Sequence, residues 1–246
     1  MKQAAWWGVL ALAAAAPAWA FDDKDELKAA AKKLADAPNY SWTTTVKNNA
    51  DNPGGARMTP GPIEGKAEKD GAVWFSTKIG ENPLEGALKG DKFAFKVRDQ
   101  WMGVGDLPGA GGGQQGRPDP AMFMGRFLKN MRPGAAGVVD AIDKMQNVKS
   151  EGDGVYSGEF TPEGAKDLLS PNRGQGGSFA PNVTDARGSV KFWVKDGMIV
   201  KAESTLQGKM SFGQRETEIN RTATTEFKDV GSTKLELPDE AKKRLE

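Results

Sequence analysis

The residue types that carry out much of protein chemistry are missing from this chain. Its 246 residues include no cysteine and no histidine. Their absence excludes disulfides, thiolate nucleophiles, zinc sites built from Cys and His, iron–sulfur clusters and catalytic triads that use histidine. The chemistry left to consider belongs to carboxylates, a glycine-rich segment, several methionines and an apolar surface.

The carboxylates form no pattern that identifies a catalytic pair or a calcium loop. The acidic residues at 22–25 suit the start of a helix, where negative charge is favourable. Glu216 and Glu218 alternate with a threonine, as on the polar face of a strand. Asp51 and Asp70 do not fit the spacing of a calcium-binding loop. A pair of acids acting on a polymer of the cell envelope stays open as one alternative function, a hydrolase.

The segment 103–118 is rich in glycine but lacks the phosphate-binding motifs. A P-loop needs Gly-Lys-Ser/Thr before a helix, and the stretch 109–116 has Gln-Gln in that place. Gly103 and Gly105 lack the third glycine of the dinucleotide fingerprint. We therefore predict a solvent-exposed, flexible loop and expect no cofactor.

The methionines of the next segment resemble a soft copper site only in composition. Met124, Phe127, Leu128 and Met131 are spaced at i, i+3, i+4 and i+7, which is the spacing of one apolar helix face. Methionine is also a common filler of adaptable apolar surfaces. The spacing predicts a helix with an apolar stripe, and we expect no metal site.

Aromatic residues recur on one face of several predicted strands. Trp42, Phe75, Phe93, Phe95 and Phe192 occupy such positions. They would form either an ordinary core beneath helices or the floor of a cavity for an apolar ligand. The residue pattern alone leaves both interpretations open.

These residues are placed by a long series of strands and a few helices. The charged segment 22–37 predicts a helix that ends at a proline, and Asp119-Pro120 predicts the start of another, followed by a third helix after Pro133-Gly134. Alternating patterns and Asp-Gly or Gly-Asp turns predict strands at 40–46, 62–68, 72–79, 83–88, 92–97 and 101–104. Further strands are predicted at 155–160, 189–195, 198–207, 214–228 and 234–237, with a loop at 170–187 and helices at 161–169 and after Pro238.

Most of these strands have one apolar and one polar face, which is typical of an antiparallel sheet covered on one side. With helices available to cover that side, the sequence predicts an α+β fold with a large curved sheet. At this length, residues 21–246 are expected to form a single domain.

The first residues have the features of a signal peptide. Lys2 precedes an apolar stretch at 6–16 that is too short to span a bilayer, which takes about 20 residues. Ala18 and Ala20 fit the small-x-small cleavage rule, so cleavage is predicted after Ala20 and the mature chain begins at Phe21. The absence of cysteine suits an oxidising compartment. We expect a periplasmic or secreted protein.

The carboxy-terminal half resembles a known family of exported proteins. Val-Lys-Phe-Trp-Val-Lys-Asp-Gly-Met-Ile-Val from Val190, the Phe-Lys-Asp-Val-Gly element at 227–231 and the strand closed by Pro238 are similar to motifs of the LolA/LppX/LprG-like superfamily of lipid and lipoprotein carriers. Asn-Tyr-Ser-Trp at 39–42, after an opening helix, also fits. Members tethered to a membrane use a lipobox cysteine, which this chain lacks.

The resemblance implies a half-barrel, a strongly curved antiparallel sheet with helices covering its concave face and an apolar cavity between them. It implies a carrier that is not an enzyme and that reversibly binds a lipid, a lipoprotein acyl group or another hydrophobic ligand. Residues 119–146 would form a helical lid. By strand and helix phase, the cavity and lid residues would be Trp42, Phe75, Phe93, Phe95, Phe127, Met131, Phe192 and Val194.

The expected partners follow from this function and from the charge. A carrier would contact a membrane or an envelope protein transiently, and we expect a monomer. The net charge of +1 argues against binding to nucleic acid, which favours a basic excess. A sensor or interaction module of the cell envelope, with the same fold and cavity, remains an alternative function.

Overall fold

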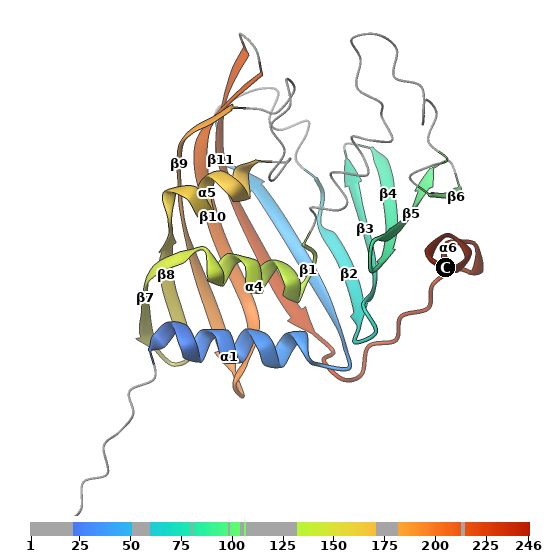
Figure 1. The fold of residues 1–246 in the computed structure, drawn as a ribbon, viewed down its shortest axis with the longest axis horizontal. Coiled ribbons are helices and arrows are strands. Elements are labelled where there is room, and N and C mark those ends of the chain that lie inside the picture. The colour runs from blue at the N-terminus through green and yellow to red at the C-terminus, as the bar shows by residue number, and fades with distance from the viewer. Residues whose placement is uncertain are drawn as a thin grey trace, which may run out of the picture.

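A computed structural model describes residues 22–50, 60–79, 81–97, 99–103, 106, 132–170, 182–212 and 215–246. Within these residues the chain forms an α+β fold, in which helices pack on one large antiparallel sheet of eleven strands (Figure 1). The sheet curves strongly around the helices, and its edge strands do not pair with each other among the described residues. The fold is therefore a half-barrel, as predicted.

The first half of the chain supplies one helix and six strands. They are α1 (Asp23–Ala35), β1 (Asn39–Asn48), β2 (Ile63–Glu68), β3 (Ala72–Ile79), β4 (Asn82–Lys89), β5 (Lys92–Val97) and β6 (Gln100–Gly103). The second half supplies α4 (Ala135–Asp143), β7 (Met145–Gly152), β8 (Val155–Phe160), α5 (Pro162–Leu169), β9 (Asn182–Lys195), β10 (Met198–Phe212), β11 (Arg215–Lys228) and α6 (Asp239–Leu245).

The sheet consists of two meanders joined along one line. Its strand order is β6-β5-β4-β3-β2-β1-β11-β10-β9-β8-β7, so every neighbour is consecutive in sequence except the pair β1 and β11. That pair is antiparallel, with Trp42 opposite Phe227 and Thr44 opposite Thr225. The side chains of directly opposite residues point to the same face of the sheet. The strand registers therefore make one apolar face continuous across the whole sheet.

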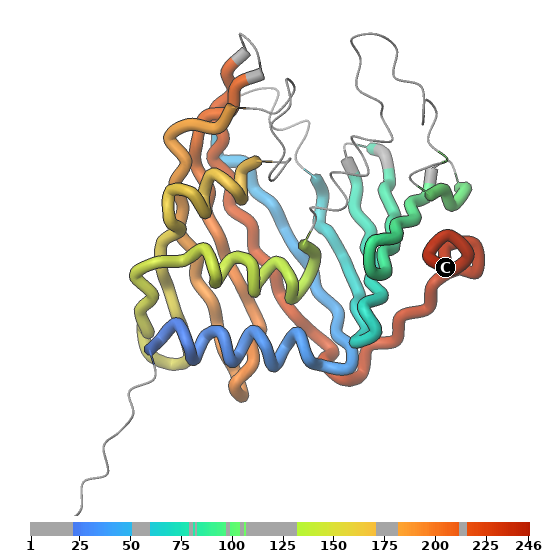
Figure 2. Tube along the Cα trace, in the orientation of Figure 1, coloured from blue at the N-terminus to red at the C-terminus, as the bar shows by residue number. Residues whose placement is uncertain are grey.

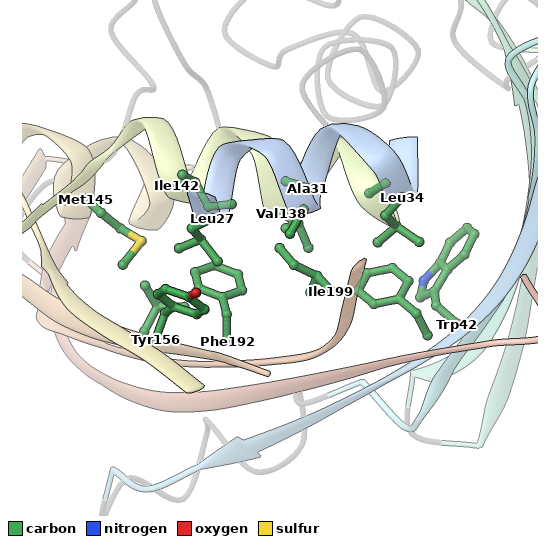
Figure 3. Close-up of a cluster of buried hydrophobic side chains, with 14 of the residues drawn as sticks. Leu27, Ala31, Leu34, Trp42, Val138, Ile142, Met145, Tyr156, Phe192 and Ile199 are labelled. Atoms are coloured by element: carbon green, nitrogen blue, oxygen red, sulfur yellow. The ribbon is translucent and has the colours of Figure 1, made fainter. Parts of the chain in front are cut away.

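Helices α1 and α4 run side by side across the concave face of strands from both halves (Figure 2). The start of α1 is set by Asp22, whose carboxylate accepts a hydrogen bond from the backbone of Lys24 at 3.3 Å. Leu27 and Leu34 of α1 are fully buried, as are Phe192 and Ile199 of the sheet beneath them. Figure 3 shows Val138 and Ile142 of α4 reaching the same core. Burial of each such side chain contributes about 1.5–3 kcal/mol.

The carboxy-terminal helix covers the other face of the sheet, which we had not predicted. Ala87, Ala94 and Trp101 point away from the concave face and pack against Ala241 and Leu245 of α6. The guanidinium of Arg244 pairs with the carboxylate of Asp106 at 2.8 Å, just after β6. Both faces of the β4–β6 region therefore bury apolar side chains.

Three predicted strand assignments differ from the structure. Residues 234–237 form no strand; Leu237 instead packs against the cluster beneath α6, which explains the alternation. Strand β10 continues through Gly208, whose missing side chain makes room for Leu169 of α5. Strand β9 begins at Asn182, inside the predicted loop.

Strand β7 was not predicted at all, and Met145, assigned to the third helix, is its first residue. This edge strand is mostly exposed and polar, so it lacks an alternating apolar pattern. The prediction for 104–131, which includes most of the glycine-rich loop and the first lid helix, falls largely outside the described residues.

The buried Tyr156 predicts a specific loss of stability at high pH. Burial, together with a hydrogen bond to the Glu26 carboxylate, raises the pKa of Tyr156 to about 12. Because the folded-state pKa lies above the ordinary value of about 10, the neutral phenol contributes stability below pH 10 that is lost as the pH rises toward 12. The full loss of stability is about 2–3 kcal/mol.

Urea unfolding of the wild type and of Tyr156→Phe from pH 8 to pH 11.5 measures this loss. Lysine titration affects both proteins equally, so the difference between their free energies of unfolding isolates the tyrosine. The wild type is expected to lose stability relative to the variant above pH 10. A difference that stays constant with pH would contradict the assignment.

Candidate functional site

Two cavities lie on the concave face, one on each side of the start of α4. Cavity 1, of about 290 Å³, lies between α4 and the sheet. Cavity 2, of about 490 Å³, lies between the end of α1, the start of α4 and the first strands. Arg132 and Pro133 line both. Apolar cavities of roughly 300–1,000 Å³ are the usual setting for small ligands.

Aromatic rings form the wall of cavity 1 on the β1–β3 side. Trp42 lies over Gly65 of the neighbouring strand, where a Cβ atom would overlap the indole ring. Phe75 lies in the same way over Gly86, where a Cβ atom would be 2.5 Å from the ring. Both rings can lie flat against the sheet because these two positions are glycine. The wall is therefore smooth and apolar.

Short side chains line cavity 1 on the β10–β11 side. Ala202 is opposite Thr225, and Ser204 is opposite Ala223. All four line the cavity, and Gly137 and Ala141 of α4 face them across it. At these positions neither the helix nor the two strands carries a side chain long enough to fill the space between them.

The start of α4 is fixed to the sheet by one tyrosine. Gly134 precedes the helix with φ of 59°, and a Cβ atom there would be 2.9 Å from the Tyr40 hydroxyl. That hydroxyl accepts a hydrogen bond from the backbone N–H of Ala135 at 3.0 Å. Burial raises the pKa of Tyr40. The start of α4, which lies between the two cavities, is thus fixed by a buried hydrogen bond and by a backbone conformation at Gly134 that favours glycine.

The structure brings four of the predicted residues to the two cavities. Trp42, Phe75 and Phe192 line cavity 1, and Phe93 lines cavity 2. Phe95 and Val194 line neither; Phe95 packs beside Phe75, and Val194 packs against the main core. Phe127 and Met131 lie outside the described residues.

Several lining residues were missed in the sequence. Thr44 shares a strand face with Trp42, so alternation could have indicated it, but its polar side chain does not resemble an apolar lining. No such signal marks Ala202, Ser204 and Ala223, because their role is to leave the cavity volume empty. Arg132 also lines both cavities.

The rest of the described chain offers no competing metal or transmembrane feature. No three acidic side chains among the described residues lie together as a metal site. No described helix is both long and apolar enough to cross a bilayer. Glu216 and Glu218, the alternating acids of the sequence, are exposed on β11 and line neither cavity.

Comparison with known proteins gives matches of structure alone. No family model matches the chain, and no curated protein matches it. Among solved structures it is similar to LprF from Mycobacterium bovis, with 14% identity, a TM-score of 0.46, and coverage of 89% of this chain and 97% of that one. It is also similar to the lipoprotein LppX from Mycobacterium tuberculosis, with 12% identity, a TM-score of 0.48, and coverage of 87% and 97%.

Proposed function

We propose that this protein is an exported carrier that reversibly binds a lipid, a lipoprotein acyl group or another hydrophobic ligand on its concave face. The observation that supports this most directly is cavity 1, which lies between α4 and the sheet beside a core of buried apolar side chains. An aromatic wall and a floor of short side chains suit an apolar chain. The function is binding and not catalysis.

The energetics are adequate for carriage without a chemical step. Moving one CH₂ group from water into an apolar site contributes about 0.8 kcal/mol. A buried segment of about ten carbons would therefore contribute about 8 kcal/mol before the entropy cost of association is subtracted. Such a complex can form and dissociate, as a carrier requires.

The proposal assigns roles to the predicted residues. Trp42, Phe75 and Phe192 would contact ligand in cavity 1, and Phe93 would do so in cavity 2. Phe95 and Val194 would support the wall and core behind them. The lid, with Phe127 and Met131 facing the ligand, remains part of the proposal, but it ends with α4 at Asp143 because Met145 begins β7. Cleavage of a signal peptide after Ala20 also remains part of the proposal.

Filling cavity 1 tests the function. Ala223→Leu adds three carbon atoms at a position that lines the cavity. We expect the affinity for a fluorescent fatty acid to fall by about tenfold or more, equivalent to about 1.4 kcal/mol. Thermal stability should stay the same or rise, because the added atoms occupy empty space and not packed core.

The matched control is Ala29→Leu, the same substitution at an exposed position of α1. It should bind the probe as the wild type does. The proposal fails if the wild-type protein binds no hydrophobic probe, or if Ala223→Leu stays folded and binds it unchanged.

A further inference from the structure

Three hydroxyl groups lie in the apolar lining of cavity 1. Thr44 of β1, Thr225 of β11 and Ser204 of β10 all contribute to it. Thr44 is on the same strand face as Trp42, and Thr225 is directly opposite Ala202, so these positions belong to the apolar face of the sheet. Hydroxyl groups placed among apolar side chains lose hydration, which costs free energy unless they form hydrogen bonds.

The two threonines bond to each other but keep a donor. Their Oγ1 atoms are 2.8 Å apart and partly buried. Whichever hydroxyl donates in that pair, the other still has a proton to donate, since each hydroxyl has one hydrogen and two lone pairs. The side-chain hydroxyl of Ser204 has no hydrogen-bond partner among the described residues. The cavity therefore presents at least two O–H donors beside its aromatic wall.

We infer that these three side chains form a polar subsite, which selects a single-chain amphiphile bearing a hydroxyl or carbonyl oxygen over a pure hydrocarbon. This inference rests on the proposed function of cavity 1. The ligand oxygen accepts hydrogen bonds from the Thr44–Thr225 pair and from Ser204, while its chain lies against Trp42, Phe75 and Phe192. A volume of about 290 Å³ is at the small end of ligand sites, which favours one chain over several.

The test measures the contribution of the ligand oxygen to binding separately from that of the hydrocarbon chain. The double variant Thr44→Val/Thr225→Val, with Ser204→Ala added in a triple variant, keeps the shape of the lining and removes its donors. Binding is measured by displacement of N-phenyl-naphthylamine with decanol and with decane. We expect the affinity for decanol to fall about tenfold in the triple variant, while the affinity for decane changes by less than about twofold.

Stability gives an independent readout. Replacing both partners of a hydrogen bond by apolar groups of the same shape is close to neutral or stabilising. The urea midpoint of the double variant should therefore equal or exceed that of the wild type, which distinguishes lost binding from lost folding.

A matched control lies on the opposite face of the sheet. Thr205 and Thr222 form the same kind of pair, with Oγ1 atoms 3.2 Å apart, but they are not part of cavity 1. Thr205→Val/Thr222→Val should bind decanol as the wild type does.

The outcomes distinguish this inference from the function on which it rests. If the wild type binds neither the dye nor the competitors, the proposed function itself fails. If it binds both competitors and the triple variant loses neither, or loses both equally, the polar subsite is wrong and the apolar carrier stands.

Discussion

Truncation of Phe192 to alanine is expected to lower the free energy of unfolding by about 3–5 kcal/mol, the usual cost for a buried phenylalanine. The side chain is fully buried and packs beneath α1 and α4 (Figure 3). It also lines cavity 1, so its removal enlarges the proposed site. We therefore expect the variant to bind bulkier or longer chains better than the wild type, and a bound chain to restore part of the lost stability.

Phe227→Ala is the matched control for this variant. Phe227 is equally part of the main core, with 6% of its surface exposed, but it lines neither cavity. It should lose comparable stability without a change in the preferred chain length. If Phe192→Ala does not fold, Phe192→Leu makes the same comparison at a smaller cost. A chain-length profile identical in the wild type and in the Phe192 variant would contradict a binding role for cavity 1.

Substitution of Gly65 by alanine is expected to cost about 3 kcal/mol, the upper part of the range for overpacking a core. The added carbon would overlap the Trp42 ring, which has to leave its place against the sheet. Because Trp42 forms a wall of cavity 1, probe affinity should fall by more than about tenfold as well. Urea unfolding and fatty-acid titration measure the two effects.

Two further variants identify the cause. Gly61→Ala, just before β2, would place its methyl group 3.6 Å from Lys78 in ordinary contact, so it should cost little. Trp42→Leu combined with Gly65→Ala should be less destabilising than the sum of the two single changes, because the smaller side chain leaves room for the methyl group. If the two losses of stability simply add, the cost of Gly65→Ala has a cause other than overlap with the Trp42 ring.

Strand alternation allowed the faces of the sheet to be predicted from the sequence. Because side chains alternate between faces with a period of two, Trp42, Phe75, Phe93 and Phe192 could be assigned to one face without knowledge of the pairing. The structure places all four on the cavities. The same alternation was misleading at 234–237. Leu237 packs against the sheet there, but its segment is not hydrogen-bonded into the sheet as a strand.

The family resemblance implied an apolar cavity, but the positions and full lining of the two cavities could not be predicted from local pattern, because they depend on distances between elements. Ala202 and Ala223 resemble ordinary sheet residues until α4 is placed over them. Gly65 and Gly86 resemble weak points of a strand, although they are the positions that let aromatic rings lie flat. An empty space is not marked by any particular residue type, so the local sequence pattern does not reveal where a cavity lies.

The pairing of β1 with β11 constrains the order in which the parts of this protein can fold. Each of the other strand pairs joins neighbours in sequence, but Thr44 and Thr225 are separated by 181 residues. Closing so large a loop costs about 3 kcal/mol more than closing a hairpin turn, so this contact forms late and limits the folding rate. Until β11 is available, β1 presents an unpaired edge to other chains. If the chain is exported amino terminus first, that edge is available to a chaperone, or to aggregation, until almost the whole protein has crossed.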